Sequence, residues 1–351
     1  MARMKYIGLY VIISVLAIGC IDEIDLNIDN EMQFVNVDGL ISDRLDTQVI
    51  KLDLSPIIGV GNDNILEPIT GASVIVKDDS GQAIPFDEDV AHPGQYKSYM
   101  AASQGRTYHV EATLPDGKVI KSIPTPVNAA VGIDSIYSRT VTDEFINFSG
   151  NKERIDFVEL YLNTDYDPSD IPFLRWRVKG VYEFKELYPR AFNPRRCYVT
   201  EKVDLNNISI FNGFDFTGNE LKEQFMVKTQ VNLRFNILYA FTVEQYRMSE
   251  REYNFWHQAD QLINIEGTLF DLPPGTIKGN LYNENDADEV ITGYFSVVSK
   301  TVKRAFVTPN DIGYQPQSDC TSLSFRPNPE RCANCLLIFN STLDKPEYWP
   351  Y

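Results

Sequence analysis

The sequence has few of the side chains on which common catalytic motifs depend. It contains three histidines, His92, His109 and His257, and none of them lies in an H-E-x-x-H pattern. It contains neither a G-x-S-x-G elbow nor a G-x-x-x-x-G-K-[ST] loop. We therefore expect a protein that is not an enzyme and that needs no cofactor and no metal. A surface hydrolase with a carboxylate pair remains an alternative, because the distance between such carboxylates is set by the fold and not by spacing in the sequence.

Positive charge is also scarce. Lysine and arginine number 32 against 49 aspartates and glutamates, which gives a formal net charge of −17. Removal of residues 1–19, with their two positive charges, would change this value to −19. A chain this acidic is not expected to bind nucleic acid or anionic lipid through its overall charge.

Long hydrophobic runs are absent beyond the first twenty residues. The chain starts with Arg3 and Lys5 and continues without charge to Gly19, which is the order of regions in a signal peptide. This run is too short for a stable membrane span, and no later segment is apolar enough for one. We expect residues 1–19 to be a signal peptide.

The apolar run ends in Leu16-Ala-Ile-Gly-Cys20, which resembles a lipobox. We expect cleavage before Cys20 and attachment of lipid to its thiol, each buried CH₂ contributing about 0.8 kcal/mol to membrane binding. An ordinary signal peptide followed by an unrelated cysteine is the alternative. The protein would then be held at a bacterial outer membrane by its N-terminal lipid.

Acidic residues follow the cysteine directly, at Asp22, Glu23 and Asp25. They resemble the surface-export signal of Bacteroidota-type lipoproteins, which directs a protein to the side of the outer membrane that faces the exterior. A solvated tether over residues 20–31 is the simpler interpretation, and the sequence does not decide between the two.

Four further cysteines, Cys197, Cys320, Cys332 and Cys335, remain for an oxidising compartment. An even number in an exported chain predicts two disulfides, and three connectivities are possible. A zinc site is less favoured, because only Cys332 and Cys335 have the spacing of a zinc-binding pair. A bridge from Cys197 to the C-terminal cysteines would close a long loop, which is worth about 4 to 5 kcal/mol in the entropic description.

Aromatic residues and period-two patterns indicate a mainly β protein. Ile50 and Leu52 alternate with polar residues, as do Tyr108 and Val110, which predicts half-buried strands. We expect residues 32–124 to form a β-sandwich of the immunoglobulin or transthyretin kind. Pro124 and Pro126 predict an extended linker at its end.

Residues 125–351 are expected to form a larger antiparallel β-rich domain with a cysteine-containing C-terminus. Alternation over 174–184 and 227–235 predicts strands with one face to a core and one to water. One helix is predicted near 249–266, where Ser249 and Glu252 have the spacing of a capping box and an aromatic stripe follows. The side chains from Asn283 to Glu289 offer enough oxygen ligands for a calcium loop, but they lack the regular spacing of known calcium loops.

Several segments of the chain form a recognisable set: Arg196–Tyr198, Met248–Trp256, Glu266–Pro274, Ile277–Asp286, Gly293–Phe295, Cys332–Cys335 and Lys345–Pro350. Together they resemble one protein family, which is catalogued as domain of unknown function (DUF) 4249, and the resemblance covers nearly the whole chain after Cys20. Such proteins are Bacteroidota-type surface lipoproteins, generally encoded beside a TonB-dependent receptor of the SusC type. The resemblance implies that the protein is located at the cell surface and works beside such a receptor. It implies no catalytic residues.

The resemblance and the anchor together predict an accessory or ligand-capture partner of such a receptor in nutrient uptake. A surface adhesion or scaffold lipoprotein is the second interpretation, since sandwich domains also serve as spacers. The helix near 249–266 and the terminal Tyr348-Trp349-Pro350-Tyr351 are candidate contact elements, although plain core packing explains both more simply.

Overall fold

The structure is a computed structural model that describes residues 33–56, 66–187, 193–203, 208–264, 277–320 and 328–351. The predicted signal peptide, Cys20 and the acidic residues Asp22, Glu23 and Asp25 lie outside these ranges, as does the predicted end of the helix at 265–266. No helix within the described ranges is long and apolar enough to cross a membrane.

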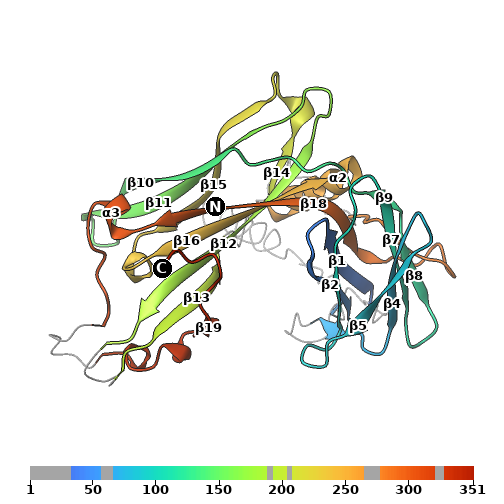
Figure 1. Ribbon diagram of the computed structural model, residues 1–351, viewed down its shortest axis with the longest axis horizontal. Helices are drawn as coiled ribbons and strands as arrows, with labels where there is room; N and C mark the ends of the chain where they lie inside the picture. Colours follow the sequence, from blue (N-terminus) through green and yellow to red (C-terminus); the bar gives the residue numbers. More distant parts are fainter. Residues whose placement is uncertain (1–32, 57–65, 188–192, 204–207, 265–276, 321–327) are drawn as a thin grey trace, which may run out of the picture.

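The described chain is mainly β-strand with one long helix (Figure 1). The first strands are β1 (Val35–Ser42), β2 (Asp46–Leu54), β3 (Glu67–Pro68), β4 (Ser73–Asp78), β5 (Ala83–Glu88), β6 (Gln95–Met100), β7 (Thr107–Thr113), β8 (Val119–Ser122) and β9 (Thr125–Pro126). The later strands are β10 (Ser135–Ile146), β11 (Lys152–Asp165), β12 (Phe173–Lys185), β13 (Arg196–Lys202), β14 (Ser209–Asn212), β15 (Glu220–Gln230), β16 (Tyr239–Met248), β17 (Leu281–Asn283), β18 (Thr292–Val307) and β19 (Ser341–Thr342). The helices are α2 (Glu250–Ile263), the short α3 (Pro309–Ile312) and the 3-10 turns η1 (Gly213–Asp215), η2 (Leu233–Phe235), η3 (Glu330–Cys332) and η4 (Cys335–Leu337).

The N-terminal part is a two-layer β unit, as predicted. Strands β5, β6, β2 and β1 form one layer with the first half of β18, and β5, β4, β7, β8 and β17 form the other. Alternate side chains of both layers fill one core, which includes Val37, Leu52, Val76, Val110 and Phe295. Period-two burial along these strands is the reason that the alternation in the sequence located them.

Two segments from late in the chain complete this unit. β17 pairs with β8 and the first half of β18 pairs with β1, so the layers are not formed by residues 32–124 alone. The segment after Pro124 also belongs to it, because Thr125–Pro126 is strand β9 and pairs with β7. The sequence could not show this, because pairing between residues so far apart leaves no local pattern.

The second unit packs a three-stranded sheet, β10-β11-β15, over a sheet built on β12, β16 and the second half of β18. Its core includes Leu160, Leu174, Trp176, Phe241 and Val243, which come from both sheets. Strand β18 runs through both units, as Figure 1 shows. Because it is hydrogen-bonded to β1 at one end and to β16 at the other, it fixes one unit against the other.

The contact between β1 and β18 is the one parallel pair among the described strands. Gly293 has φ +90° there, and a Cβ at this position would lie 2.2 Å from the carbonyl oxygen of Val37. Nearby, the buried side chain of Asn280 bonds to both backbone groups of Phe295, at 2.8 and 2.9 Å. Asn280 thus extends the hydrogen bonding along the edge of β18.

Two of the strand predictions in the second unit are wrong in part. The strand predicted to continue to Phe235 ends at Gln230, because Asn232 accepts the backbone N–H of Arg234 and caps the 3-10 turn η2. The polar face of the strand over 174–184 was expected in water, but Arg175 is 7% exposed and Glu183 1%. β12 is central to its sheet and is largely covered on both faces, although Lys179 remains exposed.

Candidate functional site

A polar pocket of about 310 Å³ lies where helix α2 packs on the continuous sheet. Its lining comes from β12, β16, β18, β1 and β2 and from Trp256 on the helix. The strand register aligns the residues across the sheet, with Arg175 opposite Tyr246 and Tyr246 opposite Lys300. Residues opposite each other on neighbouring strands have adjacent side chains, so the pocket floor is a row of polar groups.

The pocket is basic although the chain is acidic. Its lining contains five basic and three acidic side chains, namely Lys51, Arg175, Arg177, Lys179 and Lys300 with Asp38, Asp46 and Glu244. Three of the five basic residues come from β12 alone, because positions 175, 177 and 179 share one face of a strand. We refer to this pocket below as the basic pocket.

Arg175 is the central group of the basic pocket. Its side chain is buried, and its guanidinium carbon lies 3.4 Å from the centroid of the Trp256 ring. Neither Arg175 nor Arg177 makes a hydrogen bond or an ion pair through its side chain with any residue in the described part of the chain. Burial and the positive charge of Arg177 lower the pKa of Arg175 to about 10. A buried cation without a bonded carboxylate is costly for the folded protein.

Glu244 neutralises two of the three lysines of the pocket instead. Its carboxylate oxygens lie 3.1 Å from Lys179 Nζ and 2.7 Å from Lys300 Nζ, and one of them accepts a 2.7 Å hydrogen bond from the Tyr246 hydroxyl. Burial alone would raise the pKa of Glu244, but Lys179, Lys300 and the Tyr246 hydroxyl lower it to about 2. Glu244 is thus an anion at neutral pH, and its negative charge is balanced by Lys179 and Lys300.

Glu252 lies behind the pocket, between α2 and β18. One of its oxygens, Oε1, accepts hydrogen bonds from Ser296 Oγ at 2.7 Å and from Trp256 Nε1 at 3.3 Å, while Oε2 has no donor among the described residues. Complete burial raises the pKa of Glu252, against the opposing effect of Ser296 and the nearby Arg175. Burial thus works against ionisation of Glu252, and no ion pair joins its carboxyl group to Arg175 in the described structure.

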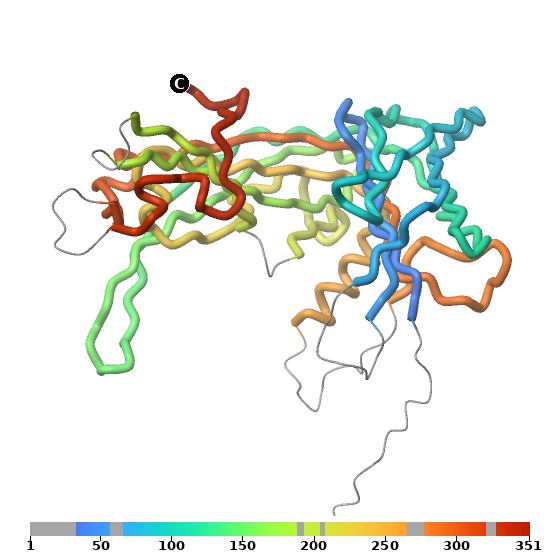
Figure 2. Tube along the Cα trace, turned by 90° about the horizontal axis from the view of Figure 1, so that it is seen from below, coloured from blue at the N-terminus to red at the C-terminus, as the bar shows by residue number. Residues whose placement is uncertain are grey.

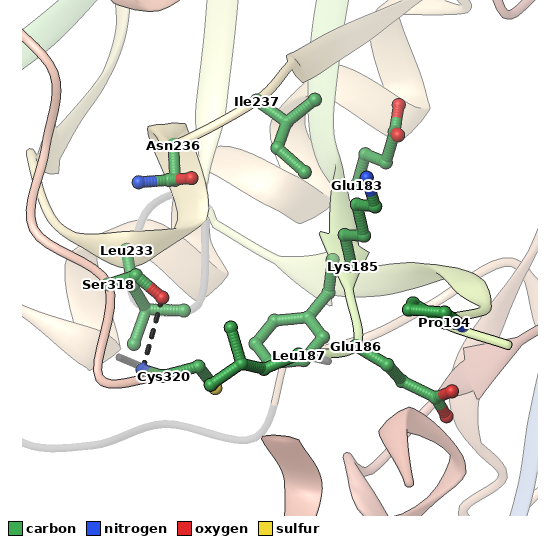
Figure 3. A pocket seen from close by; sticks show the side chains of 11 residues that line it. Glu183, Lys185, Glu186, Leu187, Pro194, Leu233, Asn236, Ile237, Ser318 and Cys320 are labelled. Atoms are coloured by element: carbon green, nitrogen blue, oxygen red, sulfur yellow. Dashed lines mark hydrogen bonds between the residues drawn. The ribbon is translucent and has the colours of Figure 1, made fainter. Parts of the chain in front are cut away.

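A second pocket, of about 450 Å³, lies beside the C-terminal cysteines (Figure 3). Its carboxylates already have partners, because Glu183 binds Arg196 and Trp349 Nε1 while Glu186 binds Arg195. Cys320 in its wall belongs to a disulfide. Its one basic lining residue, Lys185, is exposed, so the described lining of this pocket contains no buried cation of the kind found at Arg175.

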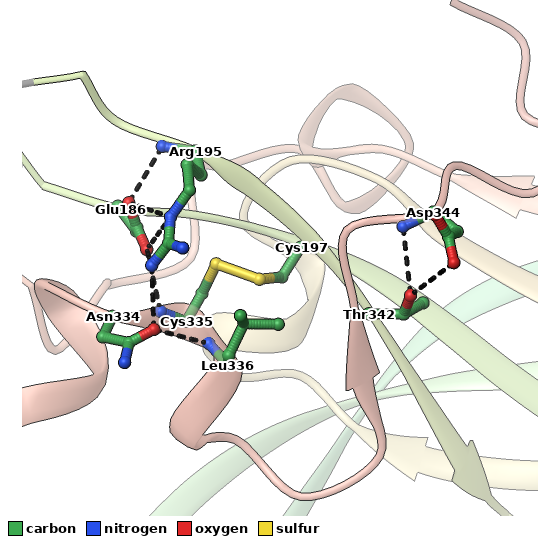
Figure 4. Close-up of a disulfide and its surroundings, with 8 residues drawn as sticks. All are labelled: Glu186, Arg195, Cys197, Asn334, Cys335, Leu336, Thr342 and Asp344. Atoms are coloured by element: carbon green, nitrogen blue, oxygen red, sulfur yellow. Dashed lines mark hydrogen bonds and ion pairs between the residues drawn. A yellow bond between two sulfur atoms is a disulfide. The ribbon is translucent and has the colours of Figure 1, made fainter.

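The four cysteines form two disulfides, as predicted. They join Cys197 to Cys335 and Cys320 to Cys332, with Cα atoms 6.0 and 5.5 Å apart. The first bridge ties β13 to the C-terminal segment beside Glu186, as Figure 4 shows. Of the three connectivities that the sequence allowed, the structure thus selects one.

Glu186 supports the first bridge. Its Oε1 accepts hydrogen bonds from Arg195 and from the backbone N–H of Cys335 at 3.0 Å (Figure 4). Burial opposes its ionisation, but the bonds from Arg195 and the backbone lower the pKa of Glu186 to about 2. The carboxylate is thus a structural anion that fixes the C-terminal segment.

The segment from Asn283 to Glu289 uses its oxygens within the protein. Asn283 Oδ1 accepts the backbone N–H of Asn285, and Glu289 binds Asn283 Nδ2 and, at 2.6 Å, Lys118 Nζ. Within the described ranges, no cluster of three or more His, Cys, Asp or Glu side chains is placed to hold a metal ion.

The other candidate residues from the sequence are either packed in the core or placed outside the basic pocket. Trp349 is 4% exposed and donates to Glu183, so the C-terminal aromatic is a core residue. Helix α2 packs on the sheet through Tyr253 and Trp256, as its stripe predicted. The histidines lie apart from the basic pocket, His92 beside Asp89, His109 beside Glu111 and His257 on the ring of Tyr253.

Sequence reasoning missed Arg175 and Arg177 because alternation assigned them to a solvent face. One signal was present in the sequence: three basic residues at spacing two in a chain with excess acid. A basic strand face in an acidic protein is unusual enough to indicate a site. The partner strands that enclose the face could not be read from the sequence.

Comparison with known proteins gives a family and little beyond it. No curated protein matches the chain. One solved structure, titled "Biofilm associated protein - B domain", aligns at 9% identity over 77% of this chain and 86% of that chain, with a TM-score of 0.12. A likeness this weak supports no statement about fold or function. A family model matches residues 21–304, and the chain belongs to that family, which is described as domain of unknown function (DUF4249).

Proposed function

We propose that this protein is a lipid-anchored lipoprotein on the exterior of a bacterial outer membrane, and that it captures a ligand for a TonB-dependent receptor of the SusC type. The lipobox ending at Cys20 and the acidic residues after it support the location. The receptor partnership is what the resemblance of the sequence implies. Lipid would confine both proteins to one plane, where a modest interface is enough to hold them together.

The observation that carries ligand capture is the state of Arg175. A buried guanidinium with no bonded acceptor among the described residues destabilises the folded protein unless another interaction compensates for its charge. It lines a pocket of about 310 Å³, at the lower end of the roughly 300 to 1,000 Å³ that small-molecule sites occupy. A ligand that supplies the missing acceptor accounts for both features.

The two buried carboxyl groups at the pocket, Glu244 and Glu252, are not arranged for hydrolysis. A pair of hydrolytic carboxylates needs one member whose pKa is raised so that it can act as an acid. Glu244 has a lowered pKa and is held by three donors. Glu252 has the raised pKa, but it is fully buried behind Ser296 and Trp256 and does not line the pocket.

The β10–β11 hairpin offers a contact surface for the receptor. Phe145, Ile146 and Phe148 at its tip are 40%, 70% and 114% exposed. Figure 2 shows the hairpin, in green, projecting from the body of the molecule. Exposed aromatic and aliphatic side chains at a projecting tip are typical of protein interfaces. The C-terminal Trp349 is unsuited to this role because it is buried.

The test is affinity purification of the tagged protein from native outer membranes at low salt, followed by identification of what accompanies it. We expect the neighbouring receptor to be recovered, and to be lost or reduced when Ile146 and Phe148 are both changed to Ser. Phe339→Ser is the matched control, because Phe339 is 85% exposed at a different place on the surface. Recovery of the lipoprotein alone from cells that express the receptor would support the scaffold interpretation instead.

A further inference from the structure

The basic pocket contains a charge arrangement that identifies a class of ligand. We propose that it binds a small ligand through an oxyanion group (a carboxylate, phosphate or sulfate) with Arg175 and Arg177 as the principal donors. This inference rests on the proposed capture function and deepens it by naming the ligand class. Its test is a binding measurement on the isolated protein, so it is independent of the receptor.

Stacking on Trp256 leaves the edge of the Arg175 guanidinium available for hydrogen bonds. Its guanidinium carbon lies 3.4 Å from the centroid of the Trp256 ring, so the indole covers the group. The N–H groups of a guanidinium lie in its own plane and point outward from its edge. They have no acceptor in the described structure, and Arg175 lines the pocket. A planar fork held in this way matches the two oxygens of a carboxylate, phosphate or sulfate.

Arg177 adds a second donor on the same strand face. It lies opposite Glu244 in the register of β12 and β16, yet the contacts of Glu244 are to Lys179, Lys300 and Tyr246. The two arginines therefore both lack a bonded carboxylate, and their positive charges repel each other. An anion between them relieves this repulsion, and at low dielectric such relief is large.

The opposite side of the pocket has a different character. Asp38 and Asp46 line it from β1 and β2. Asp38 lies opposite Lys51, and the Asp46 carboxylate accepts the backbone N–H of Thr47 at 2.7 Å. Carboxylates accept hydrogen bonds from hydroxyl groups, so this side suits the hydroxylated end of a ligand. A sugar acid or a sugar phosphate combines both chemistries.

The experiment is calorimetric titration of the full chain, extracted from membranes in detergent, with named probes. These are inorganic phosphate, sulfate, D-glucuronate and glucose 6-phosphate, with glucose as the uncharged control. We expect at least one anion to bind, with an affinity that falls as NaCl rises, and glucose to bind far more weakly. The order of affinities separates carboxylate from phosphate and free anions from sugar-linked ones.

Arg175→Gln is expected to weaken anion binding by roughly tenfold to a hundredfold, which is the range for a hydrogen-bonded charged partner. Arg175→Lys should restore part of the affinity, because it keeps the charge but loses the fork. Arg304→Gln is the matched control, since Arg304 also stacks on an aromatic ring, 3.9 Å from Tyr348, but lies outside the pocket. Arg177→Gln provides a second variant if Arg175→Gln fails to fold.

Thermal stability separates a binding role from a structural one. If Arg175 awaits a ligand, Arg175→Gln without anion should have an unchanged or raised Tm, because an unbonded buried charge has been removed. Added anion should raise the Tm of the wild type and not that of the variant. A large fall in Tm for Arg175→Gln, matched by a similar fall for Glu252→Gln, would show an internal ion pair and overturn the proposal.

The proposal is also overturned if none of the four anions binds at millimolar concentration, or if Arg304→Gln weakens binding as much as Arg175→Gln does. Anion binding together with absence of a receptor would leave this inference intact and remove only the receptor partnership. Receptor recovery without anion binding would do the reverse. The two proposals therefore fail separately.

Discussion

Ser296 on β18 donates a 2.7 Å hydrogen bond to the buried carboxylate of Glu252 on α2. The bond joins the helix to the strand that runs through both units of the protein. Trp256, one turn further along the helix, donates to the same oxygen and carries Arg175 on its ring. The position of the pocket wall therefore depends on one carboxyl group that water does not reach.

Glu252→Gln should increase stability at neutral pH. Burial raises the pKa of Glu252 above its ordinary value of 4.5, so the folded state favours the protonated form. A raised pKa contributes stability at low pH that is lost as pH rises, because the folded carboxyl must then ionise without water. Glutamine can accept from Ser296 and Trp256 as protonated glutamate does.

Thermal melts of wild type and Glu252→Gln over a pH series test this expectation. The advantage of the variant should be small near pH 4 and should grow toward pH 8. Ser296→Ala is the companion variant, since it removes the donor and should lower the Tm at every pH. An advantage of Glu252→Gln that shrinks with rising pH would contradict the raised pKa.

Glu252 also shows how far the sequence could predict the helix. Ser249 was predicted to start it, and its side chain does accept the backbone N–H of Glu252 at 3.2 Å. The spacing also predicted that Glu252 would complete a capping box, but the carboxylate instead turns into the interface with β18. A capping pattern cannot reveal this, because Ser296 is 44 residues away and tertiary contact outweighs the local bond.

The strands, like the helix, could be predicted from the sequence only where burial leaves a local pattern. Ile50, Leu52 and Val110 were located because burial on one face leaves period two in the sequence. All ten residues of β16, Tyr239–Met248, are buried, and there alternation does not distinguish a core face from a polar one. The pocket lies on such a doubly covered region, so its residues resemble a solvent face until the neighbouring strands are placed.

The two disulfides should contribute unequally to stability. Cys197 and Cys335 are 138 residues apart, and Cys320 and Cys332 are 12 apart. In the entropic description these loops are worth about 5 and about 3 kcal/mol, respectively. We expect paired Ser replacements of the first bridge to lower the midpoint of denaturant unfolding more than those of the second.

Peptide mapping of the unreduced protein is the direct check on the same bridges. It should recover the two expected linked pairs, and thiol titration after denaturation without reductant should find close to no free thiol from these four cysteines. Linked peptides that join Cys320 to Cys335 would show a different connectivity. Four free thiols would exclude the framework.

Acid should loosen the C-terminal segment through Glu186. The bonds from Arg195 and the backbone hold the pKa of Glu186 at about 2, below its ordinary value of 4.5. A lowered pKa gives stability that is present above 4.5 and is lost as pH falls toward 2. Glu186→Gln should therefore flatten the stability profile in this window, whereas Glu67→Gln, at an exposed position, should leave it unchanged. Equal slopes for wild type and Glu186→Gln would refute the prediction.

The location of the protein can be tested apart from its partner. Replacing Asp22, Glu23 and Asp25 together with Ala should leave the lipid on Cys20 and turn the protein toward the periplasm, if these residues are an export signal. Cys20→Ala is the control, because it should abolish lipid labelling and release or mislocalise the protein. The measurement is digestion by protease added to whole cells, with radiolabelled lipid as the check on anchoring. The wild type should be digested and the triple variant protected.

Equal digestion of both would show that the acidic residues are only a tether, because a solvated linker tolerates the loss of charge without a change in the side of the membrane that the protein faces. A labelled, membrane-bound Cys20→Ala product would remove the anchor itself and, with it, the confinement on which the receptor partnership depends.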